Sequence, residues 1–273
     1  MEDIHEACSR CDLYAVNRLI KNGADVNANK DGESPLYISL LITDLNCNIA
    51  KLLLKHGADP NYMCTSGYSI LSTAVYRRKL FFTKLLLEYG ADINLENAVG
   101  GTPFDIFLND DHAGRSYGYR HSNTYVEMLS LLLKYGANVN NKNNRGDTLL
   151  HKIHTENTFM VHNSTKLLLE HGARVNDENN DGDTPLHMAA HSVPNYYIYN
   201  FEIIKMLLDH GAHICKKNNN KETPYDIVKK HNMYNGYVDY LRIETNKRLY
   251  IASLIIQRDV FKQYILYMFK KAI

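Results

Sequence analysis

Apolar and polar positions recur along the chain in a fixed order. A pair of apolar residues stands three and four positions before a Gly-Ala step, and a further apolar residue such as Val16, Ile49 or Phe82 lies one turn earlier. This i, i+3, i+4 spacing predicts an amphipathic helix that ends at the glycine. The apolar pairs are Leu19/Ile20, Leu53/Leu54, Leu86/Leu87, Leu132/Leu133, Leu168/Leu169 and Leu207/Leu208.

The glycine of each step suits a helix end, because a residue without Cβ adopts the left-handed conformation that often closes a helix. Polar segments follow, for example Asp25-Val26-Asn27, and their side chains can bond their own backbone in turns. The Gly-Ala steps begin at Gly23, Gly57, Gly90, Gly136, Gly172 and Gly211, at spacings of 34, 33, 46, 36 and 39 residues.

A second signature opens another helix after each turn. It places Thr or Ser before Pro, as in Thr102-Pro103 and Thr184-Pro185. Thr and Ser are good N-caps, and Pro suits the first helical turn because its missing N–H would have no helical partner. The repeated unit is therefore turn, helix, loop, helix.

The two signatures together resemble the ankyrin repeat. Residues 181–190 read Asp-Gly-Asp-Thr-Pro-Leu-His-Met-Ala-Ala, and residues 23–28 read Gly-Ala-Asp-Val-Asn-Ala. The resemblance implies an all-α ankyrin-repeat solenoid with β-turn or hairpin loops, which binds other proteins and is not an enzyme. A single unit cannot bury its apolar face alone, so stacked units are expected to share one continuous core.

The domain boundaries follow from the spacing of the signatures. We expect a solenoid over residues 1–246, with an N-terminal cap at 1–30, repeats at about 31–65, 66–98, 99–144, 145–180 and 181–219, and a degenerate repeat at 220–246. Residues 247–273 are expected to form a C-terminal helical cap. Surplus residues predict a loop at 109–123 between two helices, and smaller expansions near 158–163 and 193–200.

The expanded loops, and a composition rich in Asn, Tyr, Ile and Lys, resemble the ankyrin proteins of poxviruses and other large DNA viruses. This resemblance implies a modulator that binds a host signalling or restriction factor. An alternative is a substrate receptor for a cullin ubiquitin ligase, recruited through Lys247–Ile273. Poxviral proteins of that kind carry an F-box-like Leu-Pro segment, and none follows Asn246.

Composition narrows the choice of partner. Thirty-one Lys and Arg residues against thirty Asp and Glu residues give a net charge of +1, so no overall field favours nucleic acid or an anionic membrane. The start of the chain lacks the pattern of a secretory signal, and no apolar run is long enough for a membrane span. We expect a monomer without cofactor or small-molecule substrate, in the cytoplasm, that of the host if viral, with the nucleus as the alternative. The odd, scattered set of cysteines fits a reducing compartment: Cys8, Cys11, Cys47, Cys64 and Cys215.

Three groupings could carry metal or acid–base chemistry. Cys8 and Cys11 have half of a zinc-site spacing, and His187 and His191 lie four apart on a predicted helix. The ankyrin resemblance instead implies that His187, like His151, bonds neighbouring backbone. A third hypothesis places a loop-borne metal or hydrolytic site in the segment His112–His121, which also holds Arg115 and Arg120.

The resemblance also implies a partner-binding surface made of turn tips and the exposed side of each first helix. Asn27, with Leu19 eight positions earlier, resembles ankyrin asparagines that are hydroxylated. The tip candidates are Lys30, Glu33, Tyr68, Arg145, Asp147, Asp181 and Asp183; the helix candidates are Tyr76, Arg77, Thr155, Glu156, His191 and Ser192; the loop candidates are Tyr117 and Tyr119.

Overall fold

The computed structural model describes residues 3–42, 47–108, 123–152, 159–192, 197–230 and 240–247. Contacts group the chain into two units. The N-terminal unit holds residues 1–149 and 166–173, and the C-terminal unit holds residues 150–165 and 174–273. The division of the sequence into individual repeats and a cap stays a prediction.

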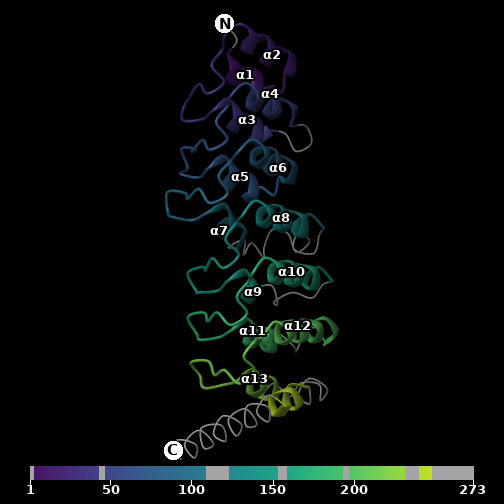
Figure 1. Ribbon diagram of the computed structural model, residues 1–273. Coiled ribbons are helices and arrows are strands. Elements are labelled where there is room, and N and C mark those ends of the chain that lie inside the picture. Colours follow the sequence, from purple (N-terminus) through teal and green to yellow (C-terminus); the bar gives the residue numbers. More distant parts are fainter. Residues whose placement is uncertain are drawn as a thin grey trace, which may run out of the picture. The chain divides into compact units, whose positions relative to one another are not determined.

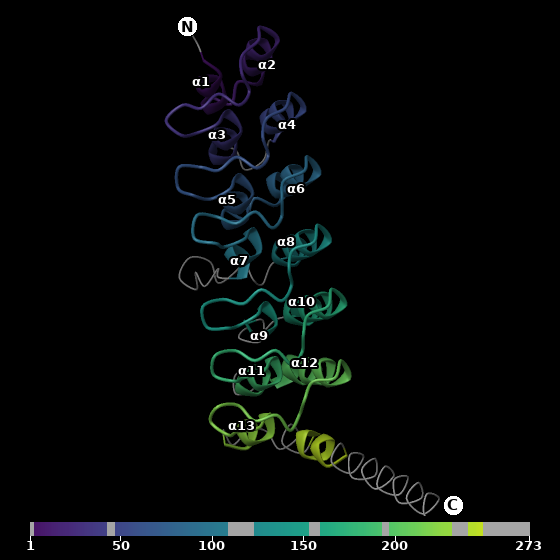
Figure 2. The same cartoon turned by 60° about the vertical axis from the view of Figure 1, so that its left-hand side comes forward.

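Helices in the N-terminal unit come in antiparallel pairs, and each pair packs on the next (Figures 1 and 2). The first helices α1, α3, α5 and α7 lie beside the turn tips, and the second helices α2, α4, α6 and α8 lie on the other side. The bounds are α1 Ile4–Ser9, α2 Leu13–Lys21, α3 Pro35–Ile42, α4 Asn48–Lys55, α5 Ile70–Tyr76, α6 Leu80–Glu88, α7 Pro103–Leu108 and α8 Asn123–Lys134.

The C-terminal unit continues the same pattern with α11 (Pro185–Ser192), α12 (Tyr197–Asp209), α13 (Pro224–Lys230) and helical residues 240–247. The boundary between the units runs through α9 (Leu149–Lys152) and α10 (Phe159–Glu170). The described residues form helices and turns, with isolated bridges in place of extended hairpins, so the predicted all-α class is confirmed. The bridges pair Lys30 with Glu33 and Met63 with Ser69.

The second helices end as the Gly-Ala steps predict. Gly57 has a φ of +88°, and its N–H donates to the Leu54 carbonyl at 3.1 Å. The N–H of Ala58 donates to the Leu53 carbonyl at 3.0 Å. This pair of bonds satisfies carbonyls that the last helical turn would leave open, and it recurs at every Gly-Ala step.

The apolar pairs before those glycines fill the core. Leu53, Leu86 and Leu132 of the N-terminal unit are fully buried, as is Leu207 of the C-terminal unit. Leu19 and Ile20 are only half-buried. Their helix, α2, packs against α1 and α4.

Two predicted loop expansions are wrong in part, because residues 159–163 and 197–200 are helical. The surplus residues lengthen the second helices at their starts: α10 has 12 residues and α12 has 13, whereas α4 has 8. In α10 the buried Val161 shows why, since an apolar residue on the core face stabilises the added turn. The predicted loop at 109–123 lies outside the described residues except for Asn123, which begins α8.

Asparagine side chains join the loops of consecutive repeats. Asn27 Nδ2 donates to the Gly57 carbonyl at 2.9 Å, and its Oδ1 accepts from the Asp59 N–H at 2.8 Å. Asn61 Oδ1 accepts from the Asp92 N–H at 2.7 Å in the same unit. In the C-terminal unit Asn176 makes the equivalent pair of bonds, with the Gly211 carbonyl at 3.0 Å and the His213 N–H at 2.8 Å.

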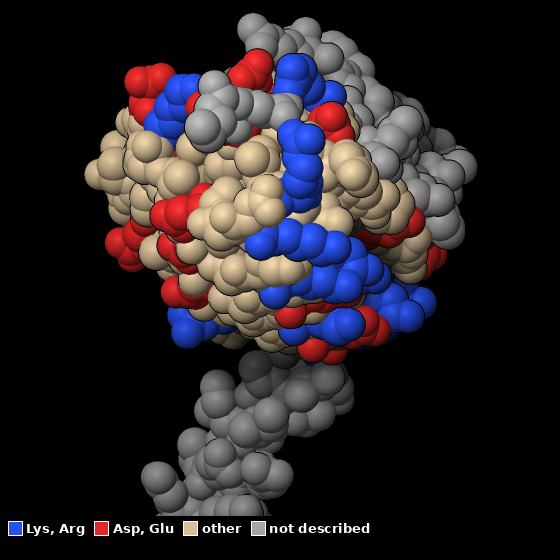
Figure 3. Space-filling view, turned by 90° about the horizontal axis from the view of Figure 1, so that it is seen from above, with Lys and Arg blue, Asp and Glu red and all other residues tan. Residues whose placement is uncertain are grey.

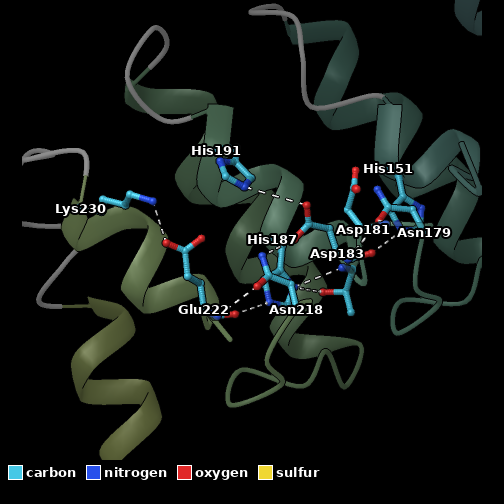
Figure 4. A network of polar contacts seen from close by, with 10 residues as sticks. His151, Asn179, Asp181, Asp183, His187, His191, Asn218, Glu222 and Lys230 are labelled. Atoms are coloured by element: carbon cyan, nitrogen blue, oxygen red, sulfur yellow. Dashed lines mark hydrogen bonds and ion pairs between the residues drawn. The ribbon is translucent and has the colours of Figure 1, made fainter. Parts of the chain in front are cut away.

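Buried histidines join first helices to the turn that follows. His187 Nδ1 accepts from the Thr184 N–H at 3.1 Å, which leaves the ring proton on Nε2. Nε2 lies 3.2 Å from the Glu222 carbonyl and donates to it (Figure 4). Burial lowers the pKa of His187, so the ring is neutral at pH 7.

The same contact occurs at two other histidines. His151 Nε2 lies 3.1 Å from the carbonyls of Asp177 and Asp183, which confirms the predicted backbone role of His151 and His187. His5 Nε2 lies 3.0 Å from the Ala28 carbonyl and 3.1 Å from that of Glu33.

A Gly182→Ala substitution should destabilise the chain more than Gly172→Ala. Both glycines have positive φ, 72° and 83°, and a left-handed alanine costs roughly 1–2 kcal/mol at either site. Only the Cβ at residue 182 would also meet a neighbour, the backbone nitrogen of Asn219 at 3.0 Å. We expect about 1–3 kcal/mol of additional loss from this overlap. Urea denaturation of both variants measures the difference, and equal losses would contradict the steric account.

A His187→Gln variant should show that the folded chain holds this ring neutral. The pKa of His187 is lower in the folded chain than in the unfolded chain, where it is about 6.5. The stability that the neutral ring contributes is therefore fully present at a pH above about 6.5 and is lost as the pH falls below that value. The parent chain should therefore be more stable than the variant by roughly 1–3 kcal/mol at pH 7.5, and the gap should narrow at pH 5.5. Denaturation curves at both pH values test this. A gap that widens on acidification would mean that the folded ring is charged.

Candidate functional site

The turn tips are held in shape by asparagines inside them. Asn143 Oδ1 accepts from the N–H groups of Arg145 and Asp147, each at 2.9 Å. Asn97 and Asn179 make the same two bonds in their own tips. The tip residues are therefore presented on a backbone whose shape is fixed before any partner binds.

Four of the predicted tip residues are exposed. Lys30 carries an ion pair with Asp3, with Nζ and Oδ2 2.6 Å apart, which raises the pKa of Lys30 and lowers that of Asp3. Tyr68 exposes 38% of its surface, and Arg145 is exposed in the same unit. Asp181 is exposed in the C-terminal unit, whereas Glu33 is half-buried. Their contact with a partner stays a prediction.

Asp147 and Asp183 differ from the other tip candidates, because both are buried, each with 8% of its surface exposed. The Asp183 carboxylate accepts from Asn218 Nδ2 at 2.8 Å (Figure 4). The Asp183 carboxylate thus bonds the following tip, and Asp147 Oδ2 lies 3.5 Å from Asn143 Nδ2 of its own tip. Because both are buried and engaged within the protein, the two aspartates are left out of the proposed interface.

The helix candidates lie at the far ends of first helices. Tyr76 ends α5 with 53% of its surface exposed, and the exposed Arg77 follows it. A helix of this length spans about 10 Å, so one partner can reach both Tyr76 and the tip residue Tyr68. His191 is exposed near the end of α11, where its Nε2 lies 4.0 Å from Asp183 Oδ2, and Ser192 ends that helix. Thr155, Glu156, Tyr117 and Tyr119 lie outside the described residues.

Two exposed apolar residues were missed by the sequence reasoning. Phe81 in α6 exposes 71% of its surface, and Val99 at a turn tip exposes 85%. The signal for Phe81 was present, because adjacent helical residues point about 100° apart and Phe82 occupies the core position at 1% exposure. A cavity of about 380 Å³ adjoins Phe81 and is also lined by Arg77 and Glu127.

Charge is unevenly spread over the second helices although the net charge is small. Seen from the N-terminal end, Lys and Arg gather in a band beside scattered acidic side chains (Figure 3). The adjacent helices α2 and α4 contain exposed basic residues and no acidic ones. The basic residues are Arg18, Lys21, Lys51 and Lys55.

The metal and acid–base hypotheses find little support in the geometry. Both nitrogens of His187 already bond protein groups, and burial raises the pKa of the Cys8 thiol to about 12. Among the described residues no group of three His, Cys, Asp or Glu side chains could hold a metal ion. The His112–His121 segment lies outside them. No helix in the described ranges is long and apolar enough to cross a membrane.

Asn27, the predicted modification site, is exposed in its turn. Its N–H donates to Asp25 Oδ1 at 2.8 Å. Its side chain belongs to the asparagine ladder, the hydrogen bonds by which Asn27, Asn61 and Asn176 join the loops of consecutive repeats. Hydroxylation of Asn27 stays a prediction.

Comparison with known proteins agrees with the repeated helix pairs and turns described above. A family model described as ankyrin repeats matches residues 4–97 and 119–223. An ankyrin repeat protein of fowlpox virus is 35% identical over 102 residues, which make up 37% of this chain and 17% of that protein. One from Acanthamoeba polyphaga mimivirus is 30% identical over 157 residues, 50% of this chain and 26% of that protein. The chain thus matches only a minor part of either relative.

A solved structure shares the fold. The crystal structure of the ankyrin repeat domain of Bcl-3 aligns with a TM-score of 0.65 at 23% identity, covering 89% of this chain and 98% of that domain. The likeness at this identity concerns the fold. Since the family model covers well over half of the sequence, the chain belongs to the ankyrin repeat family.

Proposed function

We propose that this chain binds a host signalling or restriction factor through a surface that combines turn tips, the far ends of first helices and the adjoining start of the second helix α6. Ankyrin repeats are protein–protein interaction scaffolds. The observation that carries the finer proposal is the exposure of aromatic residues on repeats whose turns are held in shape by side-chain hydrogen bonds. Tyr68, Tyr76 and Phe81 are the exposed aromatics of this surface.

Aromatic anchors on a rigid support are the usual source of binding energy in protein interfaces. They bury a large area at small entropic cost, and a few such residues carry most of the affinity. Arg77, between Tyr76 and Phe81 in sequence, adds a cation that can pair with an acidic group of the partner. This mixture suits a protein surface better than a polyanion.

Similarity to the fowlpox and mimivirus proteins supports a viral-type modulator acting in the host cytoplasm. The aligned parts cover 17% and 26% of those proteins, so the host role is a proposal drawn from a shared segment. The alternative of a cullin-ligase receptor depends on Lys247–Ile273, of which only Lys247 is described. No described residue favours it.

A paired substitution tests the proposed surface. Tyr76→Ser with Phe81→Ser should reduce capture of a specific host protein at least tenfold, because both exposed aromatic side chains are removed without disturbing the core. The measurement is quantitative pull-down with the full chain from fowl-cell and Acanthamoeba lysates, the hosts that the relatives' names indicate.

The matched control is Tyr14→Ser, which removes an aromatic side chain with 77% exposure from α2. It should leave capture unchanged, and circular dichroism should show all variants folded. Capture that is equally sensitive to the control, or a parent chain that recovers no specific protein, would refute the proposal.

A further inference from the structure

A groove opens between two neighbouring turn tips of the N-terminal unit. It has a volume of about 900 Å³ and separates the tip around Val99 from the loop around Asn138. Tyr68 lines one side, and Asp105 and Ile106 of α7 line the groove as well. Its size falls within the range of known ligand sites, roughly 300–1,000 Å³.

Elsewhere in the same unit neighbouring tips are in contact. A Cβ added to Gly67 would lie 2.6 Å from that of Ala98, whose N–H donates to the Gly67 carbonyl at 2.8 Å. At the equivalent Gly100, the nearest atom to an added Cβ is Glu96 of the same tip, at 4.0 Å. In the described part of the unit, Gly100 is thus the tip glycine that lies apart from the following tip, whereas Gly32 and Gly67 approach theirs closely.

The asparagine ladder is interrupted at the same place. Asn27 and Asn61 each bond the loop of the following repeat. Asn94 occupies the corresponding position, but over the described residues no bond joins its side chain to the loop Gly136–Asn138. Asn94 is exposed, and within the described ranges no hydrogen bond of its carboxamide is seen, so this side chain lines the groove with a donor and an acceptor.

Asn97 supplies a second such donor. Only 7% of its surface is exposed, and its Oδ1 accepts two bonds within its own tip. The equivalent Asn143 and Asn218 direct Nδ2 to aspartates, Asp147 at 3.5 Å and Asp183 at 2.8 Å.

Asn143 donates to Asp147 of its own tip, whereas Asn218 donates to Asp183 of the preceding tip. Neither acceptor is available to Asn97, because Gly101 stands at the first of these positions and Tyr68 at the second. Among the described residues, the fully buried side-chain atoms without a hydrogen-bond partner do not include Asn97 Nδ2, so this donor is accessible from the groove. A ligand carbonyl placed there would accept from it.

Asn138 and Asn141 also line the groove, but their side chains already bond the protein. Asn138 Oδ1 accepts from the Asn140 N–H at 3.1 Å, and Asn141 Nδ2 donates to Thr102 Oγ1 and Asp105 Oδ2 at 3.3 Å.

We propose that this groove binds an extended peptide segment of the partner. Carboxamides both donate and accept, which matches the alternating N–H and C=O groups of an extended backbone. The exposed Val99 and Tyr68 at the rim would hold an apolar side chain of that segment. Glu96 and Lys142 give the lining charges of both signs, which argues against a polyanion. The inference rests on the proposed protein-binding function and assigns part of it to one place.

The test uses the full chain and a phage-displayed library of random dodecapeptides. A selected peptide is synthesised with a fluorophore, and its dissociation constant is measured by anisotropy. We expect Asn94→Ala to weaken binding roughly three- to tenfold, the loss of one or two hydrogen bonds. Asn220→Ala, at an exposed tip of the C-terminal unit, is the matched control and should bind the peptide like the parent.

Two further readouts separate recognition from folding. Asn94→Ala should keep the unfolding midpoint of the parent, whereas Asn61→Ala should lower it by breaking a ladder bond. In spectra of the chain labelled with ¹⁵N at asparagine, the peptide should shift the side-chain NH₂ signals of Asn94 and Asn97 and leave that of Asn220 in place.

The possible failures are distinct. Selected peptides that bind Asn94→Ala as tightly as the parent, or that leave the Asn97 signal unmoved, would overturn the groove assignment. Failure of the library to yield any binder would overturn it as well. In both cases the pull-down result for Tyr76 and Phe81 decides the proposed function independently.

Discussion

Hydrogen bonds from the side chains of one repeat to the backbone of the next are the interaction on which each unit depends. A short helix pair buries too little apolar surface to stand alone, so its stability comes from the neighbour. Neutral histidines such as His187 donate to a carbonyl of the following turn, and asparagines such as Asn27 bond both a carbonyl and an N–H. These bonds fix the spacing at which leucines of adjacent helices meet.

The repeat and its helices could be predicted from sequence because their signals are local. A glycine that closes a helix, a Thr-Pro start and an apolar pair each depend on a few adjacent residues. His5 could also have been found, since Ile4-His5-Glu6-Ala7 aligns with Leu186-His187-Met188-Ala189, although the Thr-Pro before it is missing. The lengthened starts of α10 and α12 were harder, because a surplus residue looks the same in sequence whether it extends a loop or a helix.

The candidate site was less predictable, because exposure at a tip depends on contacts between repeats. Asp147 and Asp183 occupy tip positions in the sequence pattern, yet their carboxylates face asparagines and are buried. Phe81 and Val99 are apolar and would ordinarily be assigned to the core, yet they face outward. At the groove, no bond within the part of the chain that the structure describes joins the Asn94 side chain to the following loop, and a bond missing between distant residues leaves no local signature in the sequence.

The interruption at Asn94 also bears on how the N-terminal unit unfolds. A stack of repeats unfolds as one cooperative unit only where the interface between neighbouring repeats is stable enough to keep partly unfolded stacks from being populated. A joint with fewer cross-links is where such an array divides most readily into blocks that open at different temperatures. Beside the recess the ladder bond is missing among the described residues, although Asn141 Nδ2 bonds Thr102 Oγ1 and Asp105 Oδ2 across the same joint, each at 3.3 Å. A ligand seated in the recess would add contacts between these two repeats and so raise the temperature at which they separate.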